Sequence, residues 1–129
     1  MHASLTAIRR VAAVALPAVA AAALLAAPAH AQAGELSITK YHQGAAQRWF
    51  LTCDPDDGSH PDPGAACDML RRSGGDLERL RFRPDVACPR IYDPVHVKIR
   101  GVFYGEPKNF EETYPNPCFA DNLAAPIVP

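Results

Sequence analysis

The sequence predicts a small α+β domain in which antiparallel strands and a short helix are cross-linked by disulfides. Three observations support this fold class. The chain has four cysteines, an even number. Two regions carry short β-like runs, one of them with strict alternation of apolar and polar residues, which is typical of half-buried antiparallel strands. A stretch between them carries apolar residues at helical spacing. At 129 residues the chain is long enough for one such domain.

The first 33 residues have the three-part layout of a signal peptide. Met1–Arg10 ends in two arginines, and Val11–Ala27 is an apolar run rich in alanine and leucine. Small residues then stand at Ala29, Ala31 and Ala33, which suits signal peptidase. We therefore expect cleavage after Ala31 or Ala33, a single domain over residues 34–129, and a secreted, extracellular protein.

A membrane anchor is the alternative, because the apolar run approaches the ~20 residues that a spanning helix needs. Pro17, Pro28 and the small residues after the run favour cleavage, so no membrane association is expected for the mature domain. Cleavage after Ala33 removes two of the 13 basic residues and none of the 14 acidic ones, so the formal net charge becomes −3. This charge does not favour nucleic acid as a partner.

The cysteines are expected to form two disulfides, because small secreted domains commonly supplement a limited core with cross-links. Four cysteines allow three pairings, and the sequence leaves that choice open. Their spacing contains no C-x-x-C pair, which disfavours a zinc site. We expect neither a metal nor a cofactor. The cysteines are Cys53, Cys67, Cys88 and Cys118.

The first strands are expected at residues 36–41 and 48–53, joined by the polar connection 42–47 as a β-hairpin. Strand alternation places Trp49 with Leu51 on one face and Phe50 with Thr52 on the other. Which of the two aromatic rings faces the core stays open at this stage.

Turn-forming residues fill most of the stretch between Cys53 and Cys67. A bond between these cysteines would close the stretch and contribute roughly 3 kcal/mol in the chain-entropy model. Its aspartates lack the alternation and final glutamate of a calcium loop, so they are interpreted as solvated turn residues. A short helix is expected over residues 65–73, ended by Gly74 and Gly75, with an irregular turn over 76–80.

Strict alternation returns at residues 95–104, where Val95, Val97 and Ile99 share one face. This pattern predicts a half-buried antiparallel strand, with residues 109–114 as its partner. His96 falls on the polar face of this strand and is interpreted as a surface histidine. The chain after Cys118 is read as a short tail.

The stretch from Cys88 to Pro94 is expected to be stiff, extended and exposed. A cysteine can tie it down, and its two prolines restrict the backbone. Between them it offers Arg90, a long cationic side chain of the kind that trypsin-like proteases accept in substrates. The alternative interpretation is an ordinary edge strand that contains arginine and proline.

Two motifs give the chain a family resemblance. The first reads Cys53-x-Pro55-x-x-Gly58-x-His60-Pro61, then four residues, then Ala66-Cys67-Asp68-x-Leu70. The second reads Cys88-Pro89-x-x-Tyr92-Asp93-Pro94-Val95, followed later by Asn116-x-Cys118. Together they span about Leu51 to Cys118 and resemble the subtilisin-inhibitor-like family of secreted bacterial serine protease inhibitors.

The resemblance implies a five-stranded antiparallel sheet with two short helices, disulfides Cys53–Cys67 and Cys88–Cys118, and a homodimer. It also implies inhibition of trypsin-like and subtilisin-like proteases, with a reactive bond between Arg90 and Ile91. The remaining residues of the implied protease-binding loop are Ala87, Cys88, Pro89, Tyr92 and Asp93, and Asn116 supports this loop through its side-chain amide. The chain departs from the family in its shorter first hairpin and in the small side chain of Ala87.

Two other functions stay open from the sequence. One is a disulfide-linked binding or structural module in which Arg90 has no inhibitory role. The other is a small secreted hydrolase that uses His60 or His96. The sequence holds no recognisable triad, paired carboxylates or metal set, so we do not expect an enzyme.

Overall fold

The computed structural model describes residues 33–129, so the expected signal peptide over residues 1–33 lies almost wholly outside the described part. The elements are β1 (Gly34–His42), β2 (Ala45–Cys53), β3 (Asp57–Gly58), α1 (Pro63–Arg72), the 3₁₀ turn η1 (Leu77–Leu80), β4 (Val95–Phe103), β5 (Glu106–Tyr114) and α2 (Pro117–Ala124). Within this part of the chain, no helix is long and apolar enough to cross a membrane.

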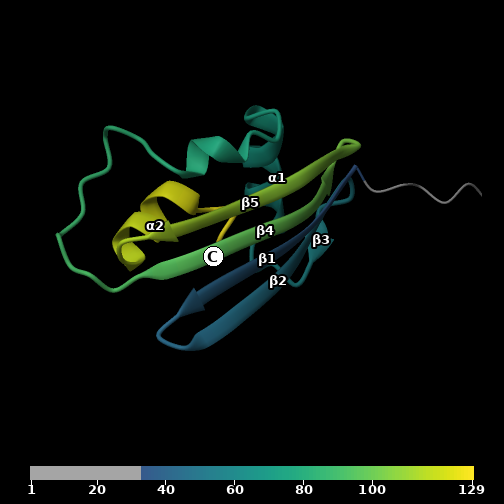
Figure 1. The fold of residues 1–129 in the computed structure, drawn as a ribbon. Helices are drawn as coiled ribbons and strands as arrows, with labels where there is room; N and C mark the ends of the chain where they lie inside the picture. The colour runs from purple at the N-terminus through teal and green to yellow at the C-terminus, as the bar shows by residue number, and fades with distance from the viewer. Residues whose placement is uncertain (1–32) are drawn as a thin grey trace, which may run out of the picture.

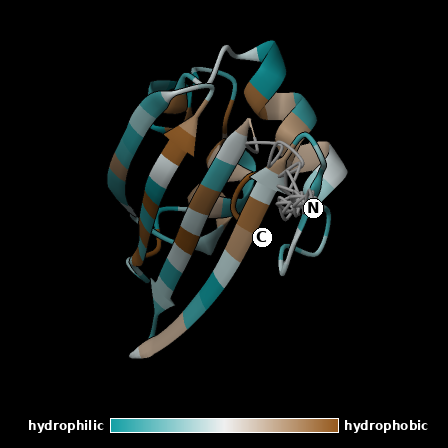
Figure 2. Ribbon diagram, turned by 90° about the vertical axis from the view of Figure 1, so that its right-hand side faces the viewer, coloured by the Kyte–Doolittle hydropathy of each residue, from teal (hydrophilic) through white to brown (hydrophobic). Residues whose placement is uncertain are grey.

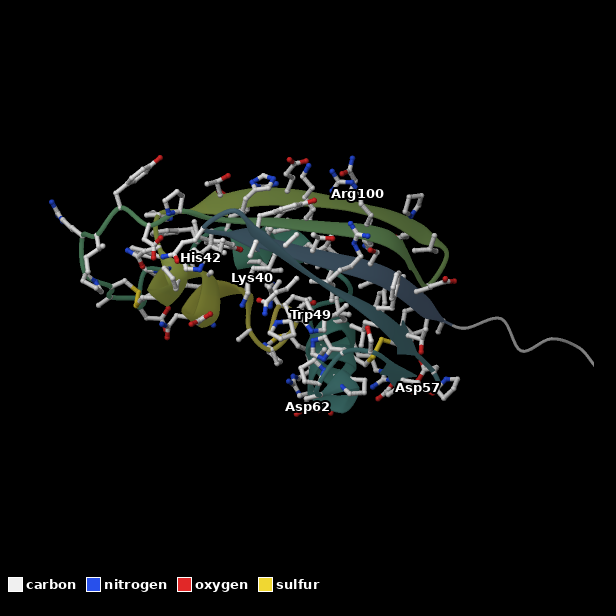
Figure 3. The ribbon with its side chains drawn as sticks, turned by 90° about the horizontal axis from the view of Figure 1, so that it is seen from below. Lys40, His42, Trp49, Asp57, Asp62 and Arg100 are labelled. Carbon is white, nitrogen blue, oxygen red and sulfur yellow. A yellow bond between two sulfur atoms is a disulfide. The ribbon has the colours of Figure 1, made fainter. Side chains whose placement is uncertain are left out.

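The five strands form one sheet in the order β3-β2-β1-β4-β5, and neighbouring strands are antiparallel. The helices lie on one face of this sheet, and the other face carries exposed side chains such as Arg100 (Figure 3). Between η1 and β4 the chain runs out past α2 at one end of the sheet (Figure 1). The α+β fold with five strands and two helices is therefore confirmed.

The core fills the space between the helices and the covered face of the sheet. Alternation along the strands places apolar side chains on this face, which Figure 2 shows as alternating bands of hydropathy. Leu51 is fully buried and Trp49 packs against the core on the same face, whereas Phe50 is 57% exposed on the outer face. Tertiary packing thus decides which aromatic ring of β2 faces inward.

The hairpin connection predicted at residues 42–47 is wrong in length. The two strands extend to His42 and from Ala45, and only Gln43 and Gly44 form the turn. Both residues have positive φ angles, 50° and 79°, as in the two-residue turns that match the twist of a hairpin. Ala45 and Ala46 obscured this turn, because alanine is depleted in strands and gives little sign that β2 begins there.

The last strand also begins earlier than residue 109, at Glu106. Pro107 is tolerated there because β5 is an edge strand, where a missing N–H costs no ladder hydrogen bond. In the neighbouring strand, Gly101 has φ +146°, and an added Cβ would lie 2.0 Å from the carbonyl oxygen of Glu35. Glycine is therefore required at this point of β4.

Proline and a capping side chain begin both helices. Asp62 caps α1, accepting a hydrogen bond from the amide of Ala65 at 3.0 Å, and Pro63 is its first residue. Asn116 and Pro117 play the same parts for α2. The prediction of a short tail after Cys118 is therefore wrong, because the chain is helical as far as Ala124. An Asn-Pro pair is the sequence signal for such a helix start.

The turn-rich stretch between Cys53 and Cys67 is closed by a disulfide between these residues, as the resemblance implies. Arg71 of α1 forms ion pairs with Asp54, Asp56 and Asp68. The hydrogen bond from Arg71 lowers the pKa of Asp56 below its usual value. Asp54 and Asp56 of the turn-rich stretch therefore hold the side chain of Arg71. Asp56 also lies near both sulfurs, but disulfide-bonded cysteines offer no thiolate to a metal.

Candidate functional site

The residues predicted to be exposed form an irregular stretch between η1 and β4. We call Ala87–Asp93 the exposed segment. No residue of the segment belongs to a helix or strand, so the edge-strand interpretation is wrong. The side chains of Ile91 and Tyr92 are 59% and 88% exposed. Large apolar groups are thus presented to solvent on a segment that lies outside the sheet (Figure 1).

Arg90 lies at the middle of the exposed segment and is itself exposed. Across residues 33–129, no carboxylate forms an ion pair with it, whereas Arg71 and Arg81 each pair with two or more carboxylates. Its guanidinium is therefore available to an external acidic group. An arginine favours a planar carboxylate, with which it can form two parallel hydrogen bonds.

Asn116 supports the backbone on both sides of Arg90. It is only 3% exposed, and its Nδ2 donates hydrogen bonds to the carbonyl oxygens of Pro89 and Ile91, each at 2.9 Å. Its Oδ1 accepts from the amide of Phe119 at 3.3 Å, which caps α2. The side-chain amide of Asn116 has two N–H donors. Both donate to the exposed segment. The beginning of α2 thus fixes the peptide units that flank Arg90.

A disulfide between Cys88 and Cys118 ties the segment to the same helix. Cys118 is the second residue of α2, directly after Pro117. The side chain of Asn122, one turn further along, donates to the carbonyl oxygen of Cys118 at 2.8 Å. One covalent and two hydrogen-bonded connections therefore join the segment to the first turn of α2.

The far end of the segment has contacts that sequence reasoning missed. The amide of Asp93 donates to the carbonyl oxygen of Pro115 at 2.9 Å. Its carboxylate lies 2.9 Å from His42 Nε2, and Gln43 Nε2 lies 3.4 Å away. The contact with His42, followed by that with Gln43, lowers the pKa of Asp93 below its usual value. His42 and Gln43 are 50 or more residues away from Asp93 along the chain, so no local pattern could reveal these two contacts.

The two histidines considered as catalytic bases have other contacts. His60 is buried, accepting from the amide of Asp62 at Nδ1 and facing the carbonyl oxygen of Ile127 at Nε2. His96 lies on the outer face of the sheet between Thr113 and Glu111. Glu111 also pairs with Lys98 and Arg100. Neither histidine lies in the exposed segment, and these contacts account for both in structural terms.

Comparison with known proteins gives consistent matches. Residues 19–116 match the family model described as subtilisin inhibitor-like. The chain is 42% identical to subtilisin inhibitor-like protein 4 of Streptomyces lavendulae, over 71% of this chain and 85% of that protein. It is 39% identical to trypsin inhibitor STI2 of Streptomyces longisporus, over 60% of this chain and 54% of that protein.

A solved structure is also similar. Sermetstatin of Streptomyces caespitosus, in complex with subtilisin of Bacillus licheniformis, superposes with a TM-score of 0.58 at 29% identity. The superposition covers 70% of this chain and 90% of that chain. The fold and the sequence motifs therefore point to the same group of proteins.

Proposed function

The chain belongs to the subtilisin inhibitor-like family, and from that premise we propose that it inhibits serine endopeptidases of the trypsin-like and subtilisin-like classes. It binds them as a substrate does, through Ala87–Asp93, and the bond between Arg90 and Ile91 is the reactive bond. The observation that carries this proposal is the pair of hydrogen bonds from Asn116 to the carbonyl oxygens on either side of Arg90.

Binding begins with the segment lying along the active-site edge of the protease, where extended peptides form main-chain hydrogen bonds. Arg90 enters the primary specificity pocket. In a trypsin-like enzyme an acidic group there accepts two hydrogen bonds from the guanidinium. A flexible peptide loses about 0.5–1.5 kcal/mol for each side chain that it orders on binding. A segment ordered by folding avoids much of this cost, which is consistent with affinities in the nanomolar range or tighter.

Resistance to cleavage follows from the same supports. The chain belongs to a family of inhibitors rather than enzymes, so the protease supplies all of the catalysis. If the bond after Arg90 is cut, the disulfide of Cys88 and the Asn116 bond to the Ile91 carbonyl keep both new ends close together. Resealing then competes with hydrolysis, because the leaving amine stays near the acyl-enzyme.

We also propose a homodimer formed through the outer face of the sheet. Phe50 and Val102 are exposed on this face and, with Ser37 and Arg100, line a shallow groove over β2, β1 and β4. Light scattering of the wild-type protein at about 50 µM should give twice the monomer mass. Phe50→Asp should give the monomer mass, because removing apolar contact area weakens such an interface, and it should still inhibit the protease. A monomeric wild-type protein would contradict the proposed dimer. It would not contradict the proposed inhibition through the exposed segment.

Secretion is part of the proposal, with cleavage after Ala31 or Ala33. The carbonyl oxygen of Ala33 accepts a hydrogen bond from the amide of Tyr104 at 2.5 Å. Only cleavage after Ala31 retains this bond, so the structure favours a mature protein that begins at Gln32. The mass of the protein in the culture medium distinguishes the two sites.

The deciding experiment is titration of active trypsin and of subtilisin with the mature protein. We expect inhibition at close to one domain per protease, and mass analysis after long incubation should find a single cut after Arg90. If neither protease is inhibited, the alternative of a disulfide-linked binding or structural module replaces this proposal. A cut at another residue would leave inhibition standing and move the reactive bond.

A further inference from the structure

The turn of the first hairpin contacts the far end of the exposed segment. His42 and Gln43 stand where β1 passes into its turn, and both reach the carboxylate of Asp93. Figure 3 shows His42 at the end of the sheet from which the segment projects. A cavity between the turn and the segment is lined by these three residues together with Tyr41, Tyr92 and His96. The supports described for Arg90 come from the beginning of α2, whereas this contact comes from the first hairpin.

We propose that His42 and Gln43 are positioning residues for Tyr92 and Asp93, the part of the inhibitory loop that follows the reactive bond, and that protonation of His42 tightens their hold. The inference rests on the proposed function for its effect on inhibition. It assigns to the first hairpin, which is remote in sequence, a part in presenting the loop to a protease.

The geometry leaves His42 Nε2 dependent on Asp93. This nitrogen is enclosed by protein, and Oδ2 of Asp93 lies 2.9 Å away, but the two atoms are not aligned for a hydrogen bond. A protonated imidazole makes the contact an ion pair, which is stronger than a contact between a neutral ring and a carboxylate. Loss of the proton removes that attraction without giving Nε2 another partner in the described part of the chain.

Other charged groups around the cavity do not compete for Asp93. His96 is held by Thr113 at 2.7 Å and by Glu111 at 2.9 Å. Lys98 lies over the ring of Tyr41, with its Nζ 5.8 Å from the ring centre, and is 3.4 Å from Glu111. Tyr92 points into solvent, with 88% of its surface exposed. His42 is therefore the basic residue that contacts Asp93 in the described part of the chain.

The sign of the pH dependence follows from the two partners. The ion pair needs a protonated imidazole, so it is favoured in acidic solution and is lost as pH rises. The pKa of Asp93 is lowered, so its carboxylate is still ionised there, and its contribution is lost only as pH falls through that lowered value. We therefore expect the hold on the loop to be strongest in mildly acidic solution, near pH 5–6.

The test compares inhibition constants for trypsin between wild type and His42→Gln at pH 6 and at pH 8.5. The ratio at each pH cancels the pH dependence of the protease itself. Partly exposed ion pairs are worth up to roughly a factor of five in an equilibrium constant. We expect His42→Gln to weaken inhibition about threefold to fivefold at pH 6 and less than twofold at pH 8.5. His96→Gln is the matched control, because this histidine lines the same cavity without contacting Asp93. Its inhibition constant should match that of wild type at both pH values.

A second measurement needs no protease. The amide of Asp93 donates to Pro115, so its hydrogen exchange reports on the order of this end of the segment. At pH 6 we expect faster exchange of this amide in His42→Gln than in wild type, with no change in His96→Gln. If wild type inhibits no protease, the proposed function fails and the exchange result still decides the inference. Unchanged exchange in His42→Gln, or an equal ratio of inhibition constants at both pH values, overturns the inference even when inhibition is observed.

Discussion

Replacement of Arg90 by glutamate is expected to abolish inhibition of trypsin while the melting temperature stays within about one degree of wild type. The side chain is exposed and, among residues 33–129, has no ion-pair partner, so the folded domain loses no contact. In the proposed complex with trypsin, the substitution removes a doubly hydrogen-bonded charge pair and introduces repulsion with the acidic pocket. Losing one partner of such a buried pair costs about 2–5 kcal/mol or more, which raises the inhibition constant by a factor of roughly 30 to 5,000, and the repulsion adds to this effect.

The control for Arg90→Glu is Arg72→Glu, which reverses the same charge at an exposed position in the last turn of α1. Inhibition constants and thermal melts measured side by side separate an effect on the pocket from an effect on net charge. We expect Arg72→Glu to inhibit trypsin as wild type does. Retention of trypsin inhibition by Arg90→Glu would assign the reactive bond to a different residue.

Removal of the Cys88–Cys118 disulfide is expected to turn the inhibitor into a slowly consumed substrate. In Cys88→Ser with Cys118→Ser, Asn116 still bonds to the loop carbonyls, so binding begins as before. After cleavage, however, the new amine is less firmly held and diffuses from the acyl-enzyme before resealing. Inhibition should be close to normal within minutes and decline over hours, as intact protein disappears. Mass analysis of the mixture follows this loss directly.

The chain provides a matched control for lost stability. Cys53–Cys67 closes a loop at the opposite end of the sheet, since Cys53 pairs with Gly34 whereas His42 lies at the other end of β1. Each disulfide contributes roughly 3–4 kcal/mol in the chain-entropy model, so both double-serine variants should melt at lower temperature. At a temperature where circular dichroism shows both to be folded, only the Cys88 and Cys118 variant should be consumed. Equal consumption of the two double-serine variants would mean that resistance to cleavage depends on the stability of the whole domain and not on the Cys88–Cys118 bond.

Local chemistry predicted most of the elements correctly. The alternation from Val95 to Ile99 marks β4, and the glycines after Arg72 mark the end of α1. The errors are one turn and one missed helix. The hairpin turn at Gln43 and Gly44 is two residues long, and α2 occupies Pro117–Ala124, most of which was read as a tail. Short elements of this kind depend on capping and on packing with the rest of the chain.

Sequence alone determined the stiffness and chemistry of the exposed segment, because the prolines, the cysteine and Arg90 are local properties of the chain. The family motifs in addition implied the cysteine pairing and the part of Asn116. Only the tertiary structure decided that Asn116 is buried with both amide hydrogens on the carbonyls that flank Arg90, and that His42 faces Asp93. The physical reason is separation along the chain. These contacts join residues 25 to about 50 positions apart, and they form only when β1, β4 and α2 are brought to the same end of the sheet.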